Sequence, residues 1–205
     1  MAGQPPWAKA NVTPPAWVGG EGASRYANPW LELVEYDAEA PTGHRTRYGV
    51  VRFKNRAVGV LPLFEDGQVV LVGQQRFPLG NYSWEMPEGG SPLGEDPLEG
   101  AKRELREETG LEARSWTKIL DLELSNSVTD EVGLCYLARG LEPSIASPDA
   151  TEALAVVRVA FRELLDAVIA GQIRDSLTVA AALRAHHMAR EGELPEALAR
   201  VMLDS

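Results

Sequence analysis

The sequence predicts an α+β fold in which helices cover the faces of a mixed sheet. Short stretches with the period-2 alternation of strands dominate the N-terminal half. One stretch with a helical period follows, and further strand-like stretches give way to helices near the C-terminus. The chain has 205 residues, 44% of them hydrophobic, which is typical of one globular domain with or without an added arm.

The N-terminal segment 1–28 is expected to be an arm, because it is rich in proline and glycine and shows neither periodicity. Trp7 and Trp17 lie within it, and such large aromatic side chains favour an arm that is held against its own body or against a second subunit. Two strands are predicted next, at 30–36 and 45–53, with a Pro-Thr-Gly turn between them.

Asp66 and Gly67 form a hairpin signal between two further strands, predicted at 57–63 and 68–76. A short extended piece at 83–86 then leads into a glycine-rich loop.

A helix is predicted over 97–109, because Asp96 suits its N-cap, Pro97 suits its first turn and Gly110 suits its C-terminal end. The remaining elements are expected to be strands at 116–124, 133–141 and 153–160, followed by helices at 161–170, about 176–190 and 195–203.

Composition disfavours several classes of protein. The formal net charge of −10 repels a phosphate backbone, so nucleic-acid binding is not expected. The single cysteine, Cys135, excludes a disulfide framework and any zinc site built from several cysteines. No apolar stretch approaches the roughly 20 residues of a membrane helix, and no secretory signal is visible, so a cytoplasmic location is expected.

Three glutamates crowd the last turns of the predicted helix. Glu104 and Glu108 are i, i+4 neighbours beside the apolar stripe, and Glu107 lies one step further round. The helix dipole disfavours each anion there by about 0.3–1 kcal/mol, and the pair also repels itself. A divalent cation would reverse both effects, and hard oxygen ligands at this spacing suit Mg²⁺ or Mn²⁺.

The stretch from Gly89 to Leu111 reads Gly-x₅-Glu-x₇-Arg-Glu-Leu-x-Glu-Glu-x-Gly-Leu. This pattern resembles the signature of the Nudix hydrolases at every position. With about one chance in fifteen at each of seven single-letter positions, a random match arises roughly once in 10⁸ starting points. Similar runs at 74–78, 84–90, 125–131 and 170–178 resemble the branch that hydrolyses ADP-ribose and nucleoside diphosphate sugars.

The resemblance implies a Nudix-type α/β/α sandwich with a mixed sheet and an N-terminal antiparallel strand extension. It divides the chain into an arm (1–28), N-terminal strands that pair with a second subunit (29–55), the Nudix hydrolase domain (56–190) and a helical tail (191–205). A homodimer is therefore expected.

By the same resemblance, Glu104 and Glu108 hold the metal ions with help from Glu107, and the backbone carbonyl of Glu88 completes the site. Arg103 is expected to orient a glutamate through a charge-assisted hydrogen bond.

A general base is expected on a loop outside this signature. Glu152 and Glu131 are the two candidates, and loop placement favours Glu152. Arg76 is a candidate phosphate clamp, because a guanidinium binds phosphate through two bonds. Glu85 is a candidate contact to the ribose or sugar, and Trp30 is a candidate to stack on the base.

The implied activity is Mg²⁺-dependent hydrolysis of a nucleoside diphosphate sugar, such as ADP-ribose or GDP-mannose, to a nucleoside monophosphate and a sugar phosphate. Two alternatives stay open. One is a Nudix enzyme for another nucleotide, either a nucleoside triphosphate or coenzyme A. The other is a catalytically silent module that binds a nucleotide.

Overall fold

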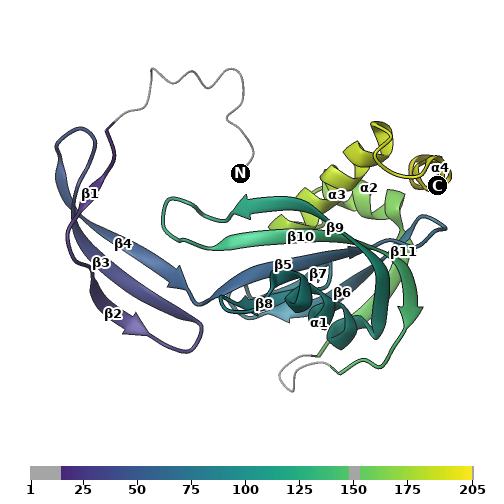
Figure 1. Cartoon of the computed structure of the whole chain (residues 1–205), viewed down its shortest axis with the longest axis horizontal. Helices are drawn as coiled ribbons and strands as arrows, with labels where there is room; N and C mark the ends of the chain where they lie inside the picture. The colour runs from purple at the N-terminus through teal and green to yellow at the C-terminus, as the bar shows by residue number, and fades with distance from the viewer. Residues whose placement is uncertain (1–14, 148–152, 205) are drawn as a thin grey trace. The chain divides into compact units, whose positions relative to one another are not determined.

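A computed structural model of the chain describes residues 15–147 and 153–204, so that Trp7 and Glu152 lie outside the described residues. The chain divides into two compact units, which are described separately (Figure 1). The first comprises the chain up to Phe53 together with Ser127–Asp130, and the second comprises Lys54–Asn126 and Glu131–Ser205.

The N-terminal unit is an antiparallel sheet. Its strands are β1 (Val18–Gly19), β2 (Ala23–Ala27), β3 (Leu31–Glu39) and β4 (Arg45–Phe53). β3 pairs with β4 along its whole length and with β1 and β2 along its other edge. Strands β1 and β2 lie in the segment for which the sequence predicted an arm without periodicity. They form because β3 supplies the hydrogen-bonding edge, which requires no alternation of side chains.

This unit buries little of its apolar surface. Among its described residues only Val34 and Ala38 are buried hydrophobic side chains. Several large apolar side chains are instead exposed, among them Trp17, Tyr26 and Trp30. A sheet of this kind gains little hydrophobic stabilisation from its own packing.

The second unit is built on a mixed four-stranded sheet in the order β8-β5-β10-β9. The strands are β5 (Asn55–Pro62), β8 (Glu88–Pro92), β9 (Leu111–Glu123) and β10 (Val132–Pro143). β5 and β10 run parallel, and the outer pairs are antiparallel. Strand β8 lies where the sequence predicted a loop, because its glycines pair with β5 at the edge of this sheet.

A second sheet, β11-β6-β7, is antiparallel. It contains β6 (Gln68–Arg76), β7 (Asn81–Glu85) and β11 (Ala155–Ala160). The predicted Asp-Gly turn is confirmed, and Gly67 adopts φ +78°. The strands on either side of this turn nevertheless join different sheets, with only an isolated bridge between Leu63 and Val69.

Among its described residues, the second unit has four helices beside its two sheets: α1 (Pro97–Thr109), α2 (Phe161–Ile169), α3 (Ser176–Arg190) and α4 (Glu196–Asp204). The ends of α1 agree with the prediction. The Asp96 side chain accepts a hydrogen bond from the backbone N–H of Leu98, and Gly110 adopts φ +66°. Asp175 caps α3 by accepting from Thr178 N at 2.7 Å. None of the described helices is long and apolar enough to cross a bilayer.

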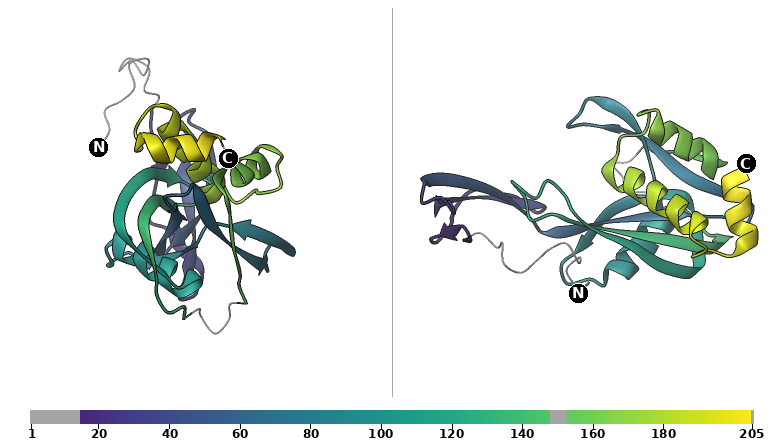
Figure 2. Two further views of the ribbon diagram at one scale, coloured as in Figure 1. Left: turned by 90° about the vertical axis from the view of Figure 1, so that its right-hand side faces the viewer. Right: turned by 90° about the horizontal axis from the view of Figure 1, so that it is seen from above.

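Side chains on β10 alternate between two cores, as the period of a strand requires. Leu134 and Tyr136 pack with α1, whereas Cys135 and Leu137 pack with α2, α3 and α4. The helices consequently lie on opposite sides of the mixed sheet (Figure 2, right). The predicted α/β/α arrangement is confirmed.

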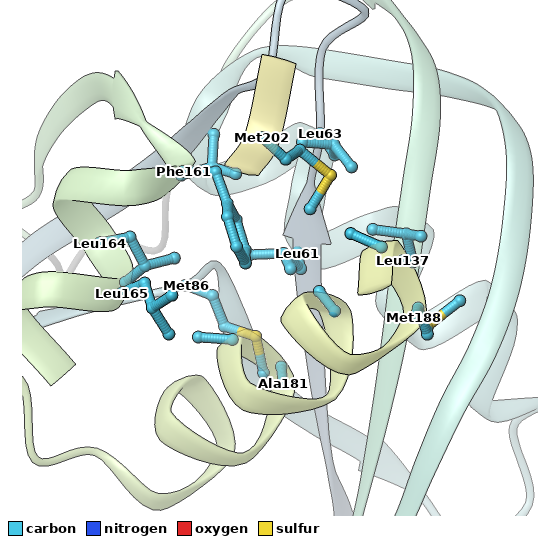
Figure 3. Close-up of a cluster of buried hydrophobic side chains, with 14 of the residues drawn as sticks. Leu61, Leu63, Met86, Leu137, Phe161, Leu164, Leu165, Ala181, Met188 and Met202 are labelled. Carbon is cyan, nitrogen blue, oxygen red and sulfur yellow. The ribbon is translucent and has the colours of Figure 1, made fainter. Parts of the chain in front are cut away.

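The larger core lies under the C-terminal helices (Figure 3). Phe161 at the start of α2 packs beside Leu61 of β5, and both are fully buried. Truncating a side chain such as Phe161 to alanine typically costs about 3–5 kcal/mol. This core fixes the start of α3 against the strands that carry the site described next.

Candidate active site

The two glutamates at i, i+4 spacing on α1 face the protein interior. Glu104 and Glu108 are 8% and 3% exposed. They are buried because they flank the stripe of Ala101 and Leu105 that packs on the sheet. Glu107 lies further round the helix and is half-buried.

Strand β8 fits closely against these carboxylates. The backbone N–H of Glu88 donates to Glu108 Oε2 at 3.0 Å. A Cβ atom on Gly89 would lie 2.3 Å from Cδ of Glu104, so any other residue at this position would force the Glu104 carboxylate to move. The first glycine of the signature thus leaves room for the Glu104 carboxylate against the β8 backbone.

Arg103 connects the helix carboxylates to β8. Its Nη1 lies 2.6 Å from Glu104 Oε1 and 3.3 Å from Glu107 Oε2. Its Nη2 donates to the carbonyl of Gly90 at 2.8 Å and lies 3.5 Å from Glu95 Oε2. Burial lowers the pKa of Arg103, but the neighbouring carboxylates raise it by more. The pKa of Arg103 therefore lies above its usual value.

These donors suit a hard divalent cation. Glu104 and Glu108 are buried anions in the C-terminal half of a helix, where the dipole disfavours them. Arg103 supplies one positive charge against the negative charges of Glu104, Glu107 and Glu108. Carboxylate and carbonyl oxygens are the ligands that Mg²⁺ and Mn²⁺ prefer.

A second carboxylate group lies on the other side of Glu88. Ligand oxygens of Glu85, Glu88 and Asp175 lie within 4.8 Å of one another, so these side chains form a group that could hold a metal ion. No other such group was found among the described residues, and this one contains none of the α1 glutamates. The Glu88 side chain therefore faces this second group, whereas its backbone faces Glu108.

Burial raises the pKa of Glu88 well above its usual value, and the negative charges of Asp175 and Glu85 raise it further. Arg76 acts in the opposite direction through its contact with Glu88. The surroundings of the Glu88 carboxyl thus favour its neutral, protonated form.

Arg76 and Glu85, which were predicted as separate substrate contacts, form one ion pair. Arg76 Nε donates to both carboxylate oxygens of Glu85 at 3.0 Å, and Nη2 lies 2.5 Å from Glu85 Oε2. The same Nη2 lies 2.9 Å from Glu88 Oε1. Glu85 is 2% exposed, so this pair is well shielded from water.

A cavity of about 750 Å³ opens between the β6–β7 hairpin and the start of α3. Its walls include Arg76, Tyr82, Glu85, Glu88 and Asp175. Asp175 was not among the predicted site residues. Its place in the run 170–178, which resembles the ADP-ribose branch, was the signal that could have identified it.

Three further residues were predicted for the site: Trp30, Glu131 and Glu152. Trp30 belongs to the N-terminal unit and is 64% exposed, in a turn fixed by bonds from Trp30 N and Leu31 N to the Asn28 side chain. Glu131 directly precedes β10, and burial raises its pKa. Glu152 lies outside the described residues.

The register of the sheet places Glu131, which directly precedes β10, near the end of the sheet at which Gly90 of β8 lies. Gly133 of β10 pairs with Ala57 of β5, which pairs with Gly90 of β8 on its other side. Two strand spacings separate β10 from β8, about 10 Å.

Comparison with known proteins agrees with this geometry. Residues 53–182 match the model of the NUDIX domain. The chain is 33% identical over 153 residues to a methanol dehydrogenase activator from Bacillus methanolicus, covering 74% of this chain and 82% of that protein.

Two relatives are ADP-ribose pyrophosphatases. The protein from Bacillus subtilis is 32% identical over 150 residues, covering 72% of this chain and 80% of its own length. The protein from Mycobacterium tuberculosis is 34% identical over 134 residues, covering 63% of this chain and 64% of its own length.

The fold is also that of a solved structure, an ADP compounds hydrolase, with a TM-score of 0.79 and 21% identity. The likeness covers 89% of this chain and 99% of that one. With a domain match over more than half of its length and the complete signature on β8 and α1, this chain belongs to the Nudix hydrolase family.

Proposed function

We propose that this protein hydrolyses the diphosphate linkage of a nucleoside diphosphate sugar and releases a nucleoside monophosphate and a sugar phosphate. The observation that carries the proposal is the pair of buried carboxylates, Glu104 and Glu108, held against the β8 backbone. ADP-ribose is the first substrate to test, because two relatives are ADP-ribose pyrophosphatases.

We assign the metal site to Glu104 and Glu108, with Glu107 and the Glu88 carbonyl as further ligands for Mg²⁺ or Mn²⁺. A divalent ion bound there supplies polarisation of a phosphoryl oxygen and a water of lowered pKa. The residues of the chain orient the ligands. Arg103 holds Glu104 through its short contact at Oε1, and Glu88 N holds Glu108 at Oε2.

The general base is assigned to Glu152, with Glu131 as the alternative. In either case a carboxylate oxygen accepts the proton of the attacking water, and the nucleoside monophosphate and sugar phosphate then separate. Burial raises the pKa of Glu131, which would place its working range at a higher pH than that of an ordinary glutamate.

Three residues are proposed to contact the substrate. Arg76 is in place to bind a phosphate oxygen, because its Nε and Nη2 atoms are fixed by Glu85 and Glu88 while the guanidinium lines the cavity. Glu85 then acts through Arg76 as well as by contact with a sugar hydroxyl. Trp30 offers an exposed aromatic face for a base.

We further propose a cytoplasmic homodimer in which the N-terminal unit provides the contact surface. Supporting this, the unit has few buried apolar residues and an apolar groove of about 230 Å³, lined by residues that include Trp17, Tyr36 and Tyr48. Light scattering at micromolar concentration should give twice the chain mass, and a monomer mass would contradict the proposal.

The activity itself is tested by product analysis. The purified protein is incubated with a panel of nucleoside diphosphate sugars, with Mg²⁺ and separately with EDTA. We expect a nucleoside monophosphate and a sugar phosphate from at least one member, only with the metal present. Coenzyme A and nucleoside triphosphates serve as competing substrates, and preferential cleavage of either would overturn the assignment.

A further inference from the structure

Thr178 is a polar side chain in the first turn of α3, and it is fully buried. The same helix places Leu177, Ala181 and Ala182 in the larger core. A buried hydroxyl is costly unless it forms a hydrogen bond, and threonine is not among the strong helix formers. A specific hydrogen-bond partner is therefore expected for the Thr178 hydroxyl.

That partner is the backbone of Met86. The N–H of Met86 donates to Thr178 Oγ1 at 2.9 Å, and 92 positions of sequence separate the two residues. Met86 and Pro87 connect β7 of one sheet to β8 of the other, so Met86 lies in neither strand. The Thr178 hydroxyl supplies the acceptor that a neighbouring strand would supply within a sheet.

The connection from β7 to β8 is held at successive backbone groups. The Pro87 carbonyl accepts a hydrogen bond from Val60 N at 2.8 Å, and the Glu88 N–H donates to Glu108 Oε2 at 3.0 Å. Proline also fixes its own φ and restricts the residue before it, which is Met86. Few backbone torsions are therefore free between the bond to α3 and Glu88.

The register of β8 on β5 sets the direction of the Glu88 carbonyl. Glu88 lies opposite Gly59, and the next pair along, Val60 and Pro87, is the one joined by a hydrogen bond. Bonded and non-bonded pairs alternate in an antiparallel ladder, so the N–H and the C=O of Glu88 both face away from β5. The N–H reaches Glu108, and the carbonyl of the same residue faces the same side.

We propose that Thr178 is a positioning residue of the metal site. Its hydroxyl holds the N–H of Met86 and, through the two-residue connection, keeps the Glu88 carbonyl beside Glu108. Thr178 is fully buried and acts only through this backbone. The inference rests on the proposed function, because it takes the α1 carboxylates and the Glu88 carbonyl as the ligands of the divalent ion.

A purely structural role for this hydrogen bond makes a different prediction. Removal of a bond that only stabilised the fold would lower the melting temperature and leave the metal affinity of the folded protein unchanged. Removal of a bond that orients a ligand lowers the metal affinity as well, because outer partners hold metal ligands in place. The test therefore measures metal binding and thermal stability on the same variants.

Thr178→Val keeps the shape of the side chain and removes the acceptor, and Thr178→Ser restores a hydroxyl. Leu198→Ala is the matched control, because Leu198 is buried in the same core on α4 and its truncation destabilises the fold by leaving a cavity. Mn²⁺ is titrated into the full chain without substrate, and free Mn²⁺ is followed by electron paramagnetic resonance. The site that disappears in Glu108→Gln is the one compared.

For that site, Thr178→Val should raise the Kd for Mn²⁺ by about tenfold, and Thr178→Ser should stay within about threefold of wild type. Leu198→Ala should lower the melting temperature and leave the Kd within about twofold. In turnover of ADP-ribose by Thr178→Val, the Mg²⁺ concentration for half-maximal activity should rise by the same factor, with KM unchanged at saturating Mg²⁺. Should Thr178→Val not fold, Thr178→Ala gives the comparison.

A lowered melting temperature with an unchanged Kd in the Thr178 variant would overturn the inference and leave the hydrogen bond a purely structural role. An equal rise of the Kd in Leu198→Ala would also overturn it, because instability alone would then explain the effect. If wild type has no Mn²⁺ site that depends on Glu108, the assigned metal site fails together with this inference. The hydrolysis itself is decided separately by the products formed from the substrate panel.

Discussion

Gly89 and Glu104 approach so closely that the Cβ of any other residue at position 89 would lie 2.3 Å from Cδ of Glu104. The carboxylate of Glu104 thus occupies the space that a side chain on β8 would need. The glycine and the glutamate of the signature are therefore coupled sterically, independently of any ligand that the carboxylate binds.

Gly89→Ala should therefore displace Glu104 by a fraction of an ångström to an ångström, since real Cβ atoms do not approach this closely. Misplacement of about 1 Å in a catalytic group can lower kcat by about 10²-fold. Gly94→Ala is the control, because a Cβ there meets nothing within 4 Å. Steady-state kinetics of both variants measures this effect. Equal kcat values for Gly89→Ala and Gly94→Ala would contradict the steric argument.

Neutralising either buried helix glutamate should abolish most of the activity. Glu104→Gln or Glu108→Gln removes one negative charge, and the loss of several kcal/mol of charge stabilisation corresponds to about 10²–10³-fold in kcat. Glu99→Gln on the exposed side of the same helix loses only a surface pair with Lys102 and should stay within about twofold of wild type. Full activity in Glu108→Gln would contradict the assigned metal site.

Arg103 should act as a positioning residue. Arg103→Lys keeps the charge but cannot reach Glu104, Glu107 and the Gly90 carbonyl together. We expect the Mg²⁺ concentration for half-maximal activity to rise by about 10–100-fold, with KM for the substrate nearly unchanged at saturating metal. Arg106→Lys, exposed on the same helix, is the matched control. An unchanged metal titration in Arg103→Lys would show that this side chain has only a structural role.

The two candidate bases are separated by parallel substitutions. Glu152→Gln should lower kcat by about 10²–10⁴-fold, and Glu131→Gln by less than about threefold. The reverse ranking would transfer the role to Glu131. In that case the acid limb of the kcat/KM profile should lie above the usual glutamate range, because burial raises the pKa of Glu131 and so extends its inactive, protonated form to higher pH.

Cys135 reports on the integrity of the core. Burial, together with the charges of Glu88 and Asp175, raises the pKa of its thiol to about 12. Only the thiolate reacts, and at pH 8 its fraction is about 10⁻⁴, against about a quarter for a thiol of ordinary pKa. Native protein should thus resist labelling by iodoacetamide, with a rate that rises about tenfold per pH unit, whereas unfolded protein labels rapidly. Rapid labelling of the native form at pH 8 would show that this core opens.

Local signals were sufficient for several elements. The boundaries of α1 follow from Asp96 and Gly110, because an N-cap and a left-handed C-terminal residue act within one turn of the helix that they delimit. The Asp-Gly turn at Gly67 is local in the same sense. The side-by-side placement of Glu104 and Glu108 follows from the helical period alone.

Pairing between distant segments required the tertiary structure. Strand β8 forms at a glycine-rich stretch because β5 offers it an edge, and β1 and β2 form because β3 does. Local residue preferences do not predict such strands, because their hydrogen bonds are made with residues far along the chain.

The sequence by itself determined the family signature, the helix that carries the acidic side chains and the order of most of the other elements. Only the tertiary structure decided that Arg76, Glu85, Glu88 and Asp175 meet in one cluster at the wall of a cavity. These residues come from β6, β7, β8 and the residue that caps α3, and the packing of that helix on the shared core brings them together. Side-chain spacing within one element follows from backbone geometry, whereas contact between elements depends on how their buried faces fit.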